Sequence, residues 1–187
     1  MILNKLFLQG LNLKAEKEVT EILSCLSLRE GSIVADIGSG GGFFAVEFAR
    51  KIGDTGKVYA VDISGKNLRF LMDYARDKGM ESRIIAVLGE ENSCLLPAAS
   101  QDLIFSHNSF HHIARPELYF QSASRAMKSE GRLVVIDRNK EAKGGRHWGH
   151  SSSPEDICSA MEAAGLSFES SQEVLKGKSF QIFRKSV

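Results

Sequence analysis

The stretch that decides the fold runs from Val34 to Arg50 and reads VADIGSGGGFFAVEFAR. With the preceding Ile33, its first residues form a short apolar run rich in β-branched side chains, which is typical of a buried parallel strand. Its last residues place Phe44 and Phe48 at helical spacing. Glycines lie between the two parts, where side chains would obstruct a tight turn. The stretch therefore predicts a strand, a glycine-rich turn and a helix.

The turn, Gly38 to Gly42, is suited to a ligand that lies against the backbone. Free N–H groups and a partial positive charge at a helix start attract a carboxylate or a phosphate. A dinucleotide fingerprint, Gly-x-Gly-x-x-Gly, would need a third glycine where Phe43 stands, and no Gly-Lys-Ser/Thr follows for a P-loop. The pattern present is Asp36-x-Gly38-x-Gly40-x-Gly42. A purely structural turn is the alternative reading.

Length and composition narrow the class of protein. The chain has 187 residues, of which 43% are hydrophobic and 25% charged, as expected for one globular domain. The net charge of +1 gives no general attraction for nucleic acid or an anionic membrane, so we expect neither as a partner. No apolar run is long enough for a signal peptide or a membrane span. Three cysteines without a Cys-x-x-Cys motif suggest reduced thiols and a cytoplasmic location.

The rest of the chain alternates between strand and helix patterns. Strands are expected at Ile33 to Ile37, Lys57 to Asp62, Arg83 to Leu88, Leu103 to Ser106 and from Gly131 through RLVVIDRN. Helices are expected at Ala15 to Leu28, Phe43 to Arg50, Asn67 to Lys78, Pro116 to Lys128 and from Pro154, with Ser153 as its cap, to Gly165. This alternation predicts a mainly parallel sheet with ligands at the carboxyl ends of its strands. The last two runs, joined at residues 176–178, predict an antiparallel hairpin.

Acidic residues follow three successive strands. Asp36, Asp62 and Glu90 end or follow the first three strands and would form an acidic rim at one edge of the sheet. Such a rim suits ribose, amine and cation groups and repels polyphosphate. Asp62 lies about 20 residues past the glycine turn, where a carboxylate can accept both hydroxyls of a ribose. The alternative is a surface aspartate that caps the following helix.

These motifs resemble the class I methyltransferases that use S-adenosylmethionine. VADIGSGGGFF is similar to their glycine motif, VYAVDIS to their ribose motif, and the residues from Leu88 to Asn92 to their adenine-side motif. DLIFSHNSFHHI and GRLVVID are similar to their fourth and fifth strands. The resemblance implies an α/β Rossmann-like, doubly wound sheet of seven strands in the order 3-2-1-4-5-7-6, with strand 7 antiparallel. It also implies one methyltransferase domain over residues 1–187, with residues 1–30 as an N-terminal cover segment and helix and 31–187 as the catalytic core.

The resemblance also implies a cofactor, a reaction and a set of binding residues. The cofactor would be S-adenosylmethionine, with S-adenosylhomocysteine as product, and the acceptor a small molecule, as in the ubiquinone/menaquinone-biosynthesis type. Glu90 departs from the aspartate that is commoner there. The implied cofactor-binding residues are Asp36, Gly38, Ser39, Gly40, Gly42, Asp62, Ile63, Glu90, Glu91, His107 and Asn108. A non-catalytic cofactor-binding regulator of the same fold is the alternative, and Phe43 disfavours a dinucleotide oxidoreductase.

All five histidines fall in two segments that adjoin in the predicted sheet: His107, His111 and His112 after the fourth strand, and His147 and His150 after the fifth. We expect their rings to converge on the acceptor, with His111, His112 and His150 as candidate catalytic residues, one of them a general base.

Local packing of the paired histidines is the bland alternative. A metal site built from His111, His112, His147 and His150 is chemically permissible, although we expect none. The acceptor pocket would be closed by residues 1–13, by residues 140–150 or by a second subunit in a homodimer.

Overall fold

A single seven-stranded sheet forms the centre of the protein. The computed structural model describes residues 2–139 and 151–186. The strands are β1 (Ile33–Ile37), β2 (Lys57–Asp62), β3 (Ile84–Leu88), β4 (Gln101–His107), β5 (Met127–Arg138), β6 (Leu166–Ser171) and β7 (Lys178–Lys185). Their order is β3-β2-β1-β4-β5-β7-β6, and β7 runs antiparallel to both neighbours while the other pairs are parallel. The predicted strand order and the antiparallel hairpin are confirmed.

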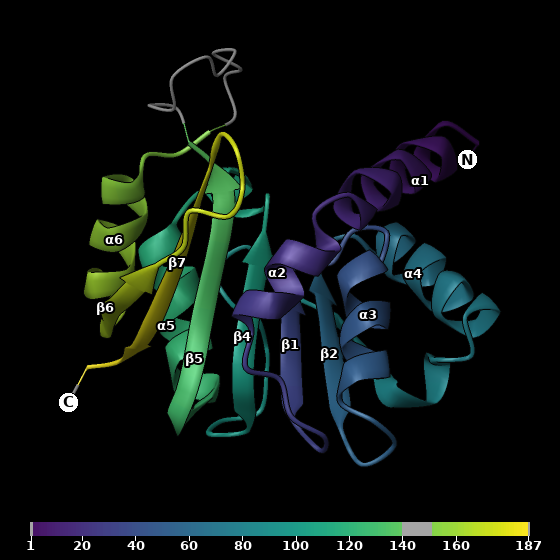
Figure 1. Ribbon diagram of the computed structural model, residues 1–187, viewed down its shortest axis with the longest axis horizontal. Helices are drawn as coiled ribbons and strands as arrows, with labels where there is room; N and C mark the ends of the chain where they lie inside the picture. The colour runs from purple at the N-terminus through teal and green to yellow at the C-terminus, as the bar shows by residue number, and fades with distance from the viewer. Residues whose placement is uncertain (1, 140–150, 187) are drawn as a thin grey trace.

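Helices cover both faces of the sheet, as Figure 1 shows. The helices are α1 (Ile2–Glu16), α2 (Val19–Cys25), α3 (Phe43–Lys51), α4 (Gly65–Asp77), α5 (Pro116–Ala126) and α6 (Pro154–Ala163), with short 3-10 helices η1 (Glu81–Arg83) and η2 (Phe110–His112). Apolar side chains of α2, α3 and α4 form one buried cluster with the sheet, and those of α5 and α6 form a second cluster on the other face. A sheet buried on both faces explains the continuous apolar runs of its central strands.

Local sequence accounts for two helix starts. The Ser64 side chain accepts a hydrogen bond from the Asn67 backbone N–H and so caps α4. At α6, Ser153 and Asp156 form a reciprocal capping box and Pro154 occupies the first turn. The predicted cap and first residue of α6 are therefore confirmed.

The N-terminal region differs from the prediction. One helix from Ala15 to Leu28 was expected, but the chain forms two helices that break at Lys17 and Glu18. The apolar period that supported the prediction belongs to α2 alone, where Ile22 is fully buried. The break turns the Glu18 side chain toward the sheet, where it finds polar partners described below. Among the described residues, no helix has the length and apolar character needed to cross a bilayer.

Candidate functional site

The glycine turn is held tightly at the carboxyl end of the sheet. The N–H groups of Gly38 and Ser39 both donate to the Val61 carbonyl of β2, at 2.9 and 3.0 Å. Gly38 has a φ of +69°, and a Cβ there would lie 2.4 Å from the Ser109 Cβ. The hydroxyl of Ser109 in turn donates to the Ile37 carbonyl at 3.1 Å. Glycine is required here because the segment after β4 packs directly on the turn.

Asp62 supports the turn from β2. Its carboxylate accepts the N–H of Gly40 at 3.0 Å and that of Ser64 at 2.8 Å. The Asn67 amide lies 3.2 and 3.3 Å from its two oxygens. Asp62 is only 8% exposed. The predicted ribose acceptor thus also organises the turn and the start of α4, and Asn67 is a partner that sequence reasoning missed.

Asp36, at the end of β1, is a buried acid with an altered pKa. Burial and the nearby negative charge of Asp62 raise the pKa of Asp36 to about 7, against a smaller opposing effect of the hydrogen bond from the Ala45 backbone. Near neutral pH, Asp36 therefore carries a proton for much of the time. Because Asp36 is often protonated, Asp36 and Asp62 together can face a cationic group without placing two full negative charges side by side.

Two buried polar atoms in the segments that follow the neighbouring strands β1 and β4 have no hydrogen-bond partner. They are the Ser39 hydroxyl and the Asn108 side-chain carbonyl oxygen. Asn108 follows β4 and has a left-handed backbone, with φ of +52°. Buried polar atoms are normally satisfied, and three more orphans lie elsewhere in the described part of the chain, on Gln101, Glu169 and Gln181. At the glycine turn, a bound ligand would supply the missing partners of Ser39 and Asn108. A hydroxyl can donate to a carboxylate and an amide oxygen can accept from an ammonium, which are the two ionic groups of an amino acid.

Exposed apolar side chains stand next to the polar site. Ile63, directly after Asp62, is 67% exposed, and Leu88 at the end of β3 is 57% exposed. Asp62 and Leu88 are register partners, so these side chains share one edge of the sheet. Glu90 and Glu91 follow and are also exposed. This edge offers apolar surface and carboxylates to a flat ring that carries an amine.

Helix α1 lies on the glycine turn. The Asn12 amide donates to the Gly41 carbonyl at 2.9 Å, and a Cβ on Gly41 would lie 2.8 Å from the Leu8 carbonyl oxygen. Leu11 is 3.6 Å from the corresponding position of Gly40. Figure 1 shows α1 above the carboxyl ends of β1 and β2.

A second polar cluster links α2 to β7 through His107. Glu18 Oε2 lies 3.0 Å from His107 Nε2 and 2.5 Å from Lys178 Nζ, and Lys178 Nζ lies 2.9 Å from His107 Nε2. Burial of the Glu18 carboxyl raises its pKa, but hydrogen bonds from His107 and Lys178 and the charge of Lys178 outweigh this and lower it to about 2. Burial lowers the pKa of His107 and of Lys178. Glu18 is therefore ionised, and His107 is neutral, near pH 7.

His107 does not join the other described histidines, contrary to the predicted convergence. Its ring packs against Phe44 and Phe105, in the cluster beneath α2 and α3. His111 directly follows Phe110 in the chain, and the Phe110 side chain belongs to the apolar cluster on the opposite face of the sheet. The side chains of adjacent strand residues point to opposite faces, so the position of His107 at the end of β4 sets its direction. Its predicted contact with a cofactor stays a prediction.

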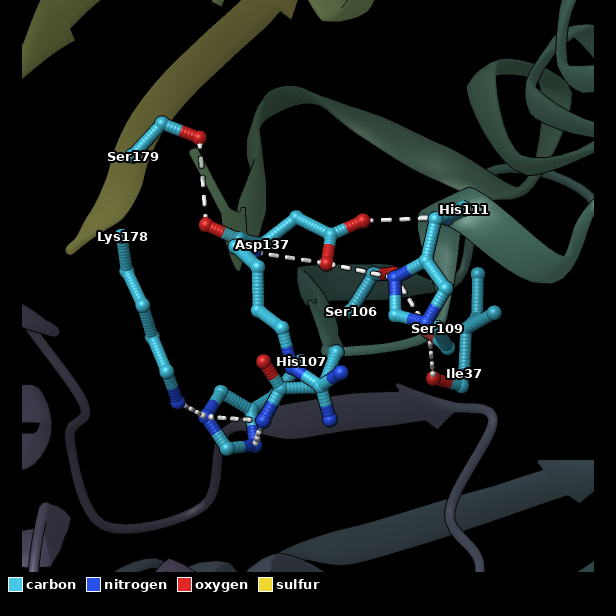
Figure 2. A network of polar contacts seen from close by, with 10 residues as sticks. Ile37, Ser106, His107, Ser109, His111, Asp137, Lys178 and Ser179 are labelled. Atoms are coloured by element: carbon cyan, nitrogen blue, oxygen red, sulfur yellow. Dashed lines mark hydrogen bonds and ion pairs between the residues drawn. The ribbon is translucent and has the colours of Figure 1, made fainter. Parts of the chain in front are cut away.

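His111 forms a close pair with Asp137 at the carboxyl end of β5. Its Nδ1 lies 2.7 Å from Asp137 Oδ1, and its backbone N–H donates to Oδ2 at 2.9 Å. The Asp137 side chain is fully buried and that of His111 is 3% exposed. Figure 2 shows the carboxylate directed at the imidazole, with Ser109 and Ile37 nearby. The pair therefore lies next to the glycine turn.

The predicted roles of the remaining histidines stay predictions. His112 is exposed, and its ring centroid is 4.1 Å from that of His111. His147 and His150 lie outside the described residues. In the part of the chain that the structure describes, no group of three potential metal ligands is found.

Sequence reasoning missed the partners that fix the predicted residues. Asp137 lies in the last two residues of its strand, as Asp36 and Asp62 do, and that repeated position was a usable signal. Glu18 and Lys178 are 160 positions apart, and no local pattern connects them.

Comparisons with known proteins agree with this architecture. A family model described as "Methyltransferase domain" matches residues 28–183. The ubiquinone/menaquinone biosynthesis C-methyltransferase UbiE of Yersinia enterocolitica is 28% identical over 118 residues, which cover 63% of this chain and 47% of that protein. The chain thus spans about half the length of the curated relatives that it matches.

Solved structures give the same result. A crystal structure described as a SAM dependent methyltransferase from Aquifex aeolicus has a TM-score of 0.85 and 26% identity and covers 98% of both chains. The mitomycin 7-O-methyltransferase MmcR, at 15% identity and a TM-score of 0.81, shares the fold over 97% of this chain and 57% of its own. Because the family model covers most of the chain, the protein belongs to the methyltransferase-domain family.

Proposed function

We propose that this protein is an S-adenosylmethionine-dependent methyltransferase that acts on a small-molecule acceptor. The observation that carries the proposal is the pair of orphaned buried polar atoms, on Ser39 within a glycine turn that lacks the dinucleotide pattern and on Asn108 after the neighbouring strand β4. Family membership and the related proteins support it. Methyl transfer to any acceptor would distinguish it from a non-catalytic regulator of the same fold.

The residues around the turn fit the chemistry of that cofactor. The amino-acid part would be held by Ser39, Asn108 and the backbone from Gly38 to Gly42, with the Asp36–Asp62 pair supplying negative charge to its ammonium. Asp62 would accept ribose hydroxyls in exchange for its long contacts to Asn67. Ile63, Leu88, Glu90 and Glu91 would face the adenine. His107 would contribute through Asn108 next to it.

The bound cofactor would supply a methyl group already activated on a sulfonium. The chain then has to position the acceptor, exclude water and remove a proton where the acceptor carries one. His111 is the candidate base because it is buried beside the glycine turn. Helix α1 would cover the cofactor, since Asn12 and Leu8 already lie on the turn. His112 and His150 stay candidate catalytic residues, and a homodimer stays one way to complete the pocket.

Titration calorimetry with S-adenosylmethionine and S-adenosylhomocysteine tests the proposal. We expect both to bind, and Asp62→Ala to weaken binding by about tenfold or more because it removes a charged acceptor. Asp73→Ala is the matched control, since Asp73 is an exposed acid on α4 that pairs only locally with Arg76. Thermal unfolding of both variants separates lost binding from a disordered turn. No heat with either ligand in the wild type would refute the proposal.

A further inference from the structure

The buried carboxylate of Asp137 makes three polar contacts at the carboxyl end of β5. It accepts the backbone N–H groups of His111 at 2.9 Å and Arg138 at 2.8 Å, and it lies 2.7 Å from His111 Nδ1. Burying a carboxylate costs free energy unless it is paired and hydrogen-bonded. The three contacts satisfy this fully buried carboxylate and fix its position at the carboxyl end of β5.

The contacts also determine the proton arrangement of the imidazole. An ionised carboxylate only accepts hydrogen bonds, so the ring nitrogen that faces it must carry a proton. Whenever the His111 ring carries a single proton, this geometry places that proton on Nδ1 and the lone pair on Nε2. The backbone N–H contact to the other carboxylate oxygen prevents the carboxylate from rotating away.

We propose that Asp137 is a positioning residue for methyl transfer, which fixes His111 in the tautomer whose Nε2 accepts the proton of the acceptor. This inference rests on the proposed function. The acceptor gives its proton to Nε2 as it takes up the methyl group, whose bond to sulfur breaks. The positive charge of the sulfonium ends on the imidazolium, beside the carboxylate that stabilises it. The acceptors that need such a base have a phenolic, enolic or comparably acidic proton.

Long-range proton–nitrogen NMR of the histidine rings tests the tautomer without any acceptor. In the wild type at pH 8, we expect His111, assigned by comparison with His111→Gln, to be in the Nδ1–H form. In Asp137→Asn, the amide cannot accept from both the ring and the two backbone groups, so the Nε2–H form should become populated. Ser179→Ala is the control, because the Ser179 hydroxyl donates to the main-chain oxygen of Asp137 and leaves the three contacts of its carboxylate in place. An Nε2–H ring in the wild type would overturn the proposal even if Asp137→Asn failed to fold.

Activity gives the second readout, with labelled S-adenosylmethionine and a panel of phenols and 1,3-diketones as acceptors. Asp137→Asn should lower kcat on the order of 10²-fold with little change in KM. The same substitution in a His111→Gln background should have almost no further effect, because Asp137 acts through His111. Multiplying effects would refute the coupling. If the wild type bound no cofactor and methylated no acceptor, the proposed function would fail, whereas the tautomer result would still decide whether Asp137 sets the ring.

Discussion

The contact between Glu18 and Lys178 joins the N-terminal helices to β7, and its removal gives the sharpest test of how these helices are held against the sheet. Lys178→Met keeps most of the length and apolar character of the side chain but removes the charge. Glu18 would then retain only His107, whose ring is neutral near pH 7. A partly buried carboxylate left without its cation is destabilising.

The magnitude follows from the altered pKa of Glu18. Lowering it from 4.5 to about 2 corresponds to an upper limit of about 3 kcal/mol of stability. The Glu18 side chain keeps 26% of its surface exposed, so solvent screening reduces the expected loss to about 1–2 kcal/mol. Because the folded-state pKa is the lower one, this stabilisation is present above about pH 4.5 and is lost as the pH falls toward 2.

Urea unfolding of the wild type, Glu18→Gln, Lys178→Met and the double variant measures the coupling. We expect about 1–2 kcal/mol of coupling at pH 7 and clearly less at pH 3. Hydrogen exchange should show faster opening of residues 2–17 in both single variants. The exposed pair Arg76 and Asp73 is the control and should show little coupling. Coupling below about 0.3 kcal/mol at pH 7, or equal coupling at both pH values, would refute the reasoning.

Two further predictions concern the glycine turn. Gly41→Ala should destabilise the protein by about 1–3 kcal/mol and loosen α1, because the new Cβ would clash with Asn12 and Leu8. The control, Gly10→Ala, adds a Cβ with nothing within 4 Å and should be neutral or stabilising. Thermal unfolding compares the two variants, and equal effects would contradict the packing of α1 on the turn. Asp36→Asn should raise the free energy of unfolding by roughly 1–3 kcal/mol at pH 8 and by much less at pH 4. The reason is that the raised folded-state pKa of Asp36 costs stability as the pH rises from about 3.8 to 7. Urea unfolding at both pH values measures the difference, and a difference independent of pH would contradict the raised pKa.

Local patterns were sufficient to predict most of the sheet and the glycine turn. The strand that contains Asp36, the spaced glycines and the helix from Phe43 lie within one short stretch, and their geometry depends mainly on neighbouring residues. The same holds for α6, whose start follows from Ser153 and Pro154. The strand order, in contrast, came from the resemblance to a known family rather than from any pattern in the residues.

Prediction failed where the partners are distant in the chain. The break before α2 could not be seen in an amphipathic period, because Glu18 is fixed by His107 and Lys178 from two other strands. Likewise, the five histidines follow two strands that adjoin in the predicted sheet, which suggested one site, but strand alternation directs His107 to one face of the sheet.

By itself, then, the sequence determined the turn from Gly38 to Gly42 and the acids at the strand ends, because these depend on backbone conformation and on the two-residue period of a strand. Only the tertiary structure decided which side chains pair with them. It brought Asn12 onto Gly41, left Ser39 without a partner and set Asp137 against His111. Such contacts depend on how strands and helices pack in space, and their partners are far apart in the chain, so no local sequence pattern indicates them.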